Sequence, residues 1–249
     1  MGDASHRELR VVNLTKWFGN LHVLDNISFN VKSDEVCVMV GPSGCGKSTT
    51  LNIISRLIPA TSGKVFLGNE ETDPRIHKIS YIFQEETCFP YLNVQENIEF
   101  GLKIRGVPKA ERKQRADKLI KLLGLEEYRF AYPKNLSRTL KQLVILARAF
   151  IIEPDILLMD EPYGNFDPIM RRYLEDLIVK LRAQFQCPLL FVTHNIEEAC
   201  YLGDRVLVLS QKPARIKEEI RIDIPRPRNT NDSRFIKVVE RIIELIRWW

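Results

Sequence analysis

The feature that most constrains this chain is the glycine-rich run GPSGCGKST at residues 41–49. It has the spacing GxxxxGK[ST], in which glycines let backbone NH groups turn toward phosphate oxygens and a lysine adds a positive charge. The segment before it, LDNISFNVKSDEVCVMVG, predicts strand that ends in the glycine loop, and residues 48–57 predict the helix that follows. A strand, a phosphate loop and a helix in this order indicate an α/β fold that binds phosphate at a helix N-terminus.

The residue types within this loop predict individual roles. Lys47 is expected to place its ammonium group near the β- and γ-phosphates of a nucleotide, and the Ser48 hydroxyl is expected to bind Mg²⁺. The remaining loop residues are candidates for contact with the phosphates: Gly41, Pro42, Ser43, Gly44, Cys45, Gly46 and Thr49. The alternative is a glycine-rich turn that binds no ligand.

Two acidic residues end a second buried strand, far downstream. The segment DILLMDEP, residues 155–162, is apolar up to Asp160, whose carboxylate can hold Mg²⁺ through water. Glu161 follows at once and is the candidate general base, since a carboxylate beside the γ-phosphate can orient a water molecule and accept its proton. The segment PLLFVTHN predicts another inner strand of a parallel sheet. It places His194 at the carboxyl end, where ligands bind in open α/β sheets, although a structural histidine is the alternative.

Composition excludes several other classes of protein. The chain has 249 residues, 45% hydrophobic and 28% charged, as in a globular domain with a substantial core. Its net charge of +5 is dispersed among nearly as many acids as bases, so no nucleic-acid partner is expected. Five cysteines without a CxxC pair favour reduced thiols over a zinc site. The N-terminal MGDASHRELR lacks the apolar core of a signal peptide, and no run is long enough to span a bilayer.

The middle and the end of the chain have helical periodicity. VQENIEFGLKI and KAERKQRADKLIKLLGL predict helices of an insert within the sheet domain, and DSRFIKVVERIIELIRWW predicts an amphipathic helix. We expect this last helix to pack on its own domain or on a neighbour, with membrane contact as the alternative. The predicted organisation is one domain over residues 1–249, with a nucleotide-binding core at 1–85 and 149–215, a helical insert at 86–148, and a C-terminal strand and helix at 216–249.

The order of the motifs resembles the ATP-binding cassette of ABC transporters over nearly the whole chain. The matching segments are GPSGCGKST, IFQE, LSRTLKQLVILARA, ILLMDEP, GNFD and VTHN. The resemblance implies an α/β fold of the P-loop NTPase (RecA-like) type, with a parallel-sheet core, an ABC-type helical subdomain and N-terminal antiparallel strands. It also implies a protein that binds ATP and Mg²⁺ and hydrolyses ATP as one half of a dimer.

The resemblance implies roles for further residues. Phe18 in TKWFG would stack on adenine, with burial of Phe18 or stacking by Trp17 as the alternatives. Gln84 would contact Mg²⁺ and the attacking water, His194 the γ-phosphate, and Asp167 the dimer seam. The implied catalytic residues are Glu161, His194 and Gln84, and the implied metal ligands are Ser48, Gln84 and Asp160.

Within the family, ETCFPYLNVQENIEFGL and IDIPRPR are similar to importer ATPases of the nitrate, sulfonate and taurine type. The similarity implies two ATPase subunits on the cytoplasmic face of the membrane, peripheral to two transmembrane permease subunits, with an external binding protein that delivers a small solute. The apolar CFPYL cluster after Gln84 is expected to receive a short helix of the permease. A non-transport or regulatory ABC ATPase is the main alternative, and a P-loop kinase would match GPSGCGKST alone.

The chain departs from the family at the signature loop. The family reads LSGGQ or LSGGM, whereas residues 136–140 read LSRTL. In the dimer this loop faces the γ-phosphate bound on the other subunit, so Ser137 is a candidate nucleotide contact and a predicted helix N-cap. Arg138 and Thr139 add side chains where glycine permits close backbone approach. Three interpretations stay open: pairing with a different ATPase whose signature is intact, a homodimer with two slow sites, or an arginine that replaces the lost NH contacts.

Overall fold

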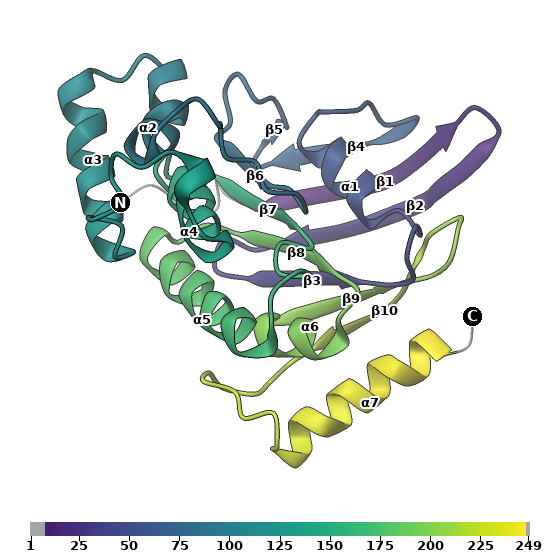
Figure 1. Ribbon diagram of the computed structural model, residues 1–249. Helices are drawn as coiled ribbons and strands as arrows, with labels where there is room; N and C mark the ends of the chain where they lie inside the picture. Colours follow the sequence, from purple (N-terminus) through teal and green to yellow (C-terminus); the bar gives the residue numbers. More distant parts are fainter. Residues whose placement is uncertain (1–7, 248–249) are drawn as a thin grey trace. The chain divides into compact units, whose positions relative to one another are not determined.

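The computed structural model describes residues 8–247, whose contacts group the chain into two units (Figure 1). Unit 1 comprises residues 1–79, 155–161 and 186–249, and unit 2 comprises residues 80–154 and 162–185. The expectation that MGDASHRELR carries no signal peptide falls mostly outside the described residues.

Unit 1 begins with a four-stranded antiparallel sheet. Its strands are β1 (Leu9–Phe18), β2 (Leu21–Val31), β4 (Ser62–Leu67) and β5 (Glu70–Glu71), in the order β2-β1-β4-β5. Strands β2 and β4 run antiparallel to β1, and β5 runs antiparallel to β4. The predicted N-terminal antiparallel strands are therefore confirmed.

The core of unit 1 is a second sheet with parallel inner strands. It contains β3 (Val36–Val40), β7 (Ile156–Asp160), β8 (Leu189–Thr193), β9 (Arg205–Leu209) and β10 (Ile216–Arg221). The order within this unit is β10-β9-β3-β8-β7, and only β10 is antiparallel to its neighbour there. Every residue of β3, β7, β8 and β9 is buried. This confirms that the continuous apolar runs are inner strands of a parallel sheet.

Three helices belong to unit 1: α1 (Lys47–Ile54), α6 (Ile196–Leu202) and α7 (Ser233–Arg247). Helix α1 ends earlier than predicted, because Arg56 adopts a left-handed conformation with φ 64° just after Ser55. Figure 1 shows α7, in yellow, beside α6, and α7 also contacts β9. Phe235 and Ile242 are buried, which confirms that the C-terminal helix packs on its own domain.

Unit 2 is helical. It contains α2 (Val94–Ile104), α3 (Lys109–Leu122), the 3-10 turn η2 (Pro133–Asn135), α4 (Arg138–Phe150) and α5 (Pro168–Phe185). The strand β6 (Ile79–Ile82) begins at the last residue of unit 1 and continues into unit 2. Asn93 and Glu96 form a reciprocal capping box that starts α2. The two predicted helical segments of the insert correspond to α2 and α3, which pack on each other and on α4.

The described part of the chain shows two further properties. All five cysteines are free thiols, as predicted. From residue 8 to residue 247, no helix combines the length and the apolar character that a bilayer crossing requires. The grouping by contacts places 162–185 with the helices of unit 2. This division by contacts differs in kind from the functional division into a nucleotide-binding core, a helical insert and a C-terminal segment. The functional division stays a prediction.

Candidate functional site

At two positions in the loop between β3 and α1, the backbone has a conformation that only glycine adopts without strain. Gly44 has φ 73° and Gly46 has φ 124°, both in the region that L side chains avoid. A Cβ atom on Gly46 would also lie 2.6 Å from a methyl carbon of Leu24. Gly46 is the N-cap of α1, so the loop turns its backbone toward a helix N-terminus that favours an anion.

Lys47 lies buried beneath this loop, with 5% of its surface exposed. Its Nζ donates hydrogen bonds to the carbonyl oxygens of Gly41 at 2.9 Å and Pro42 at 3.0 Å. Because carbonyl oxygens are neutral, these bonds satisfy the donors without cancelling the positive charge. A buried ammonium beside a helix N-terminus is a site that suits a phosphate group.

The next residue, Ser48, forms a hydrogen bond with the carboxylate of Asp160. The Ser48 Oγ donates a hydrogen bond of 3.0 Å to Oδ1 of Asp160, which ends β7 and is 7% exposed. Oxygen ligands of this kind suit Mg²⁺, which keeps several waters and takes one or two protein ligands together with substrate phosphates. Among the described residues no cluster of three or more His, Cys, Asp and Glu side chains forms a metal cage. The residues therefore fit an ion that is held jointly with a nucleotide.

Glu161 and His194 are joined by a hydrogen bond at the carboxyl ends of neighbouring strands. His194 Nδ1 lies 2.8 Å from Glu161 Oε2, with side chains 59% and 18% exposed respectively. When the carboxylate is ionised, Nδ1 must carry the hydrogen of this bond, which leaves Nε2 for another group. Glu161 has φ 44°, and its NH donates to the carbonyl of Val192 at 2.9 Å. An outlier of this kind at a strand end is typical of a functional position.

The aromatic side chains at the turn between β1 and β2 are exposed. Phe18 is 47% exposed, and Lys16 Nζ lies 4.7 Å from its ring centroid. Trp17 stacks on His22, with ring centroids 4.0 Å apart and planes 7° apart. Phe18 is therefore not a core residue, and its stacking on adenine stays a prediction.

Three other predicted residues belong to unit 2. Gln84 lines a cavity of about 550 Å³ together with Arg138 and Asn165. Ser137 Oγ accepts a hydrogen bond from the NH of Leu140 at 3.3 Å, which confirms the predicted N-cap of α4. Asp167 Oδ1 accepts hydrogen bonds from the NH groups of Ile169 and Met170 at the start of α5. The nucleotide contacts expected of Gln84 and Ser137 stay predictions.

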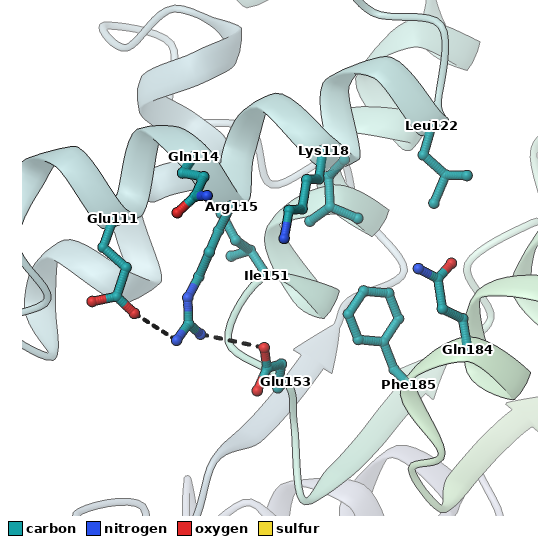
Figure 2. Close-up of a pocket in the computed structure, with 10 residues that line it drawn as sticks. Glu111, Gln114, Arg115, Lys118, Leu122, Ile151, Glu153, Gln184 and Phe185 are labelled. Carbon is teal, nitrogen blue, oxygen red and sulfur yellow. Dashed lines mark hydrogen bonds and ion pairs between the residues drawn. The ribbon is translucent and has the colours of Figure 1, made fainter.

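A larger cavity of unit 2, about 730 Å³, contains none of the predicted residues. Figure 2 shows Arg115 on α3 between Glu111 and Glu153, with Leu122 and Phe185 at the other side of the cavity. Its two positive and two negative side chains balance. We assign no role to this cavity.

The sequence did not reveal the partners of two arginines. Arg138 binds Glu86 and the carbonyl oxygen of Asn165 in unit 2. Arg228 is buried in unit 1, where its guanidinium donates to backbone oxygens. These oxygens belong to Cys200, Tyr201, Gly203, Ile222 and Ile224. Burial, and then the charge of Arg226, lowers the pKa of Arg228 to about 10. Neither set of contacts has a sequence motif, because most of the partners lie 25 or more residues away in the sequence.

Comparisons with known proteins identify the family and support the fold. Residues 24–164 match the family described as ABC transporter. The chain is 41% identical to an uncharacterized ABC transporter ATP-binding protein of Methanocaldococcus jannaschii, covering 96% of this chain and 91% of that one. It is 38% identical to a taurine import ATP-binding protein of Rhizobium johnstonii, covering 90% and 86%. Its fold is similar to the dimeric structure of an ATP-binding cassette in a post-hydrolysis state with ADP and phosphate, at a TM-score of 0.75 and 30% identity, covering 87% and 100%.

Proposed function

The chain belongs to the ABC transporter family as an ATP-binding, ATP-hydrolysing protein, and we propose that it powers the import of a small solute of the nitrate, sulfonate or taurine class. The observation that carries the proposal is the unit 1 site, where Lys47 lies under the phosphate loop and the pairs Ser48–Asp160 and Glu161–His194 lie at adjoining strand ends. The taurine import relative supports the class of solute.

The proposed roles follow from the contacts. Lys47 exchanges its two carbonyl partners for phosphate oxygens when ATP binds, while Ser48 and Asp160 hold Mg²⁺. When bound, Mg²⁺ supplies positive charge that offsets the charge of the phosphates. Glu161 orients a water molecule, whose oxygen forms a bond to the γ-phosphorus as the bond to the β–γ bridging oxygen breaks. The proton of this water passes to the carboxylate, and His194 Nε2 contacts the γ-phosphate.

Residues outside these pairs complete the proposed site. Phe18 stacks on adenine, using the ring face that Lys16 leaves available. Gln84 contacts Mg²⁺ and the attacking water, and Ser137 contributes its hydroxyl to the nucleotide bound on the other subunit. The α4 N-terminus, which Ser137 caps, suits a phosphate oxygen in this position.

The proposed partners are a second ATPase subunit and two permease subunits, with an external binding protein that delivers the solute. The chain would lie at the cytoplasmic face of the membrane. Tyr91, 71% exposed beside Phe89 in the loop after Gln84, suits contact with a short permease helix.

Transport is tested in membrane vesicles that contain the chain and the permease subunits with which it copurifies. ATP on the side of this chain should drive uptake of taurine or another sulfonate presented with the binding protein, and Lys47→Ala should abolish uptake. Export of these solutes would contradict import. ATP hydrolysis that no solute or permease stimulates would favour the alternative, a regulatory ATPase.

The altered signature predicts an asymmetric or slow dimer. Arg138 and Thr139 carry side chains where the family has glycine, so backbone NH groups of this loop approach the opposite nucleotide less closely. Either a different subunit with an intact signature completes the site on this chain, or two copies of this chain form a homodimer with two slow sites.

Restoring glycine at both positions separates these arrangements. In a homodimer the double variant R138G/T139G should hydrolyse ATP at least about tenfold faster than R138A/T139A, because each lost donor to a developing charge costs on the order of 3 kcal/mol and recovery of half of that already gives about a factor of ten. The alanine pair is the matched control, since it shortens the same side chains without restoring the freedom of the glycine backbone. The measurement is steady-state phosphate release at equal folded concentration.

The same comparison of glycine and alanine pairs should give a different result in a dimer of this chain with a different ATPase subunit. If this chain pairs with an ATPase whose signature is intact, the glycine pair and the alanine pair should differ in turnover at this chain's own nucleotide by less than about twofold, since that nucleotide already faces the partner's loop. Equal rates of ATP hydrolysis for the glycine and alanine pairs in the homodimer would show that the distance between the signature-loop backbone and the opposite nucleotide does not limit hydrolysis.

A further inference from the structure

Arg138, which stands in place of the first signature glycine, is bound within its own unit. Its Nε donates to Oε1 of Glu86 at 3.2 Å, and its Nη1 donates to the carbonyl oxygen of Asn165 at 2.9 Å. Glu86 lies two residues after Gln84, and Asn165 lies two residues before Asp167. One side chain therefore joins the start of α4 to two loops that are distant in the sequence.

Glu86, which accepts one of these hydrogen bonds, also binds a second cation. Lys141, one turn further along α4, places its Nζ 2.9 Å from Oε2 of Glu86. Hydrogen bonding from Lys141 and then from Arg138 lowers the pKa of the Glu86 carboxyl. The carboxylate thus stays ionised through the neutral range and can hold both groups. Gln84 lines the same cavity as Glu86, Arg138 and Asn165.

The contact depends on arginine at this position. A guanidinium has donors on separate nitrogens of one rigid plane, so it can serve a carboxylate and a carbonyl at once. Glycine has no side chain to make either contact, and a lysine ammonium is a single point donor at the end of a flexible stem. The substitution that removes the signature glycine therefore also introduces a link that the family pattern lacks.

We propose that Arg138 is a positioning residue that acts within its own subunit, holding the loop of Gln84 and the loop of Asp167 against α4 before the dimer closes. The proposal rests on the proposed function, in which both loops take part in hydrolysis. Ordering the loops beforehand lowers the entropy lost when the site assembles. The arrangement differs from an arginine that reaches the phosphate on the opposite subunit, because Nε and Nη1 of the guanidinium already donate to groups of its own subunit.

The test compares R138Q, E86Q and the double variant in the full chain. R138Q should raise hydrogen exchange of the backbone amides in residues 83–88 and 163–167, and E86Q should raise it in residues 83–88. Each should lower kcat by up to about threefold with KM for ATP unchanged, since exposed ion pairs are individually weak. The double variant should lose no more than R138Q alone, because R138Q already removes the contact to Glu86. R138K should lie between wild type and R138Q.

Lys141→Gln is the matched control, since it removes the other ion pair of Glu86 and leaves Arg138 bound to Asn165. It should change exchange and kcat by less than about half as much as R138Q. A fall in kcat for R138Q with no change for E86Q would overturn the proposal in favour of an arginine that acts on the opposite subunit. Unchanged exchange in both loops would also overturn it. Exchange needs no hydrolysis, so an inactive wild type would contradict the proposed function and leave this measurement decisive.

Discussion

The phosphate loop holds the positively charged ammonium group of Lys47 in place by hydrogen bonds. The loop supplies the carbonyl oxygens of Gly41 and Pro42 to a buried ammonium, and its backbone is left-handed at Gly44 and Gly46. A phosphate oxygen can replace either carbonyl at low cost, because one acceptor is exchanged for a stronger, charged one. The residue is thus placed for binding without a large rearrangement.

Lys47→Ala should therefore weaken ATP binding by at least about tenfold, since a charge-assisted hydrogen bond in a dry site contributes roughly 1.5–3 kcal/mol. Titration with a fluorescent ATP analogue measures this directly. Lys64→Ala is the control, because Lys64 is exposed on β4. Affinity equal to wild type in Lys47→Ala would mean that the loop does not bind phosphate through this residue.

The elements of unit 1 are joined at one point by Arg228. The segment after β10 passes the end of α6, where this single guanidinium binds five backbone oxygens. Its side chain is 1% exposed, so the carbonyls it binds are shielded from water. Helix α6 begins directly after Asn195, next to His194, so the same helix connects the candidate site to the C-terminal segment.

Arg228→Ala should lower the free energy of unfolding by about 3 kcal/mol, because it leaves several buried carbonyl oxygens without donors. Urea unfolding followed by circular dichroism measures the change. Arg221→Ala on β10 is the control and should stay within about 0.5 kcal/mol of wild type, since Arg221 is exposed. A loss below about 1 kcal/mol for Arg228→Ala would show that water replaces the guanidinium.

Sequence patterns predicted the elements whose cause is local. Continuous apolar runs identified β7 and β8, and the glycine spacing located the phosphate loop, because burial on both faces and backbone freedom each affect the sequence directly. The end of α1 was predicted too late, since a left-handed arginine has no reliable signal. The link from Arg138 to Glu86 spans 52 residues, so it depends on tertiary structure that the altered signature alone does not reveal.

At the scale of the whole molecule, the candidate residues are distributed between the two units. Lys47, Ser48, Asp160, Glu161 and His194 belong to unit 1, whereas Gln84, Ser137 and Asp167 belong to unit 2. Under the proposed function, hydrolysis therefore requires both units of one chain and a loop of a second subunit. The chemical step still depends on one group, the Glu161 carboxylate, so this residue tests the whole account.

The most direct measurement is ATP binding and phosphate release by wild type and Glu161→Gln under the same conditions. The amide keeps the shape of the side chain but cannot accept a proton, so binding should match wild type while phosphate release falls by a factor of at least about 100. A Glu161→Gln protein that binds ATP and releases phosphate at the wild-type rate would contradict the assignment of Glu161 as the general base, and with it the mechanism proposed for this site.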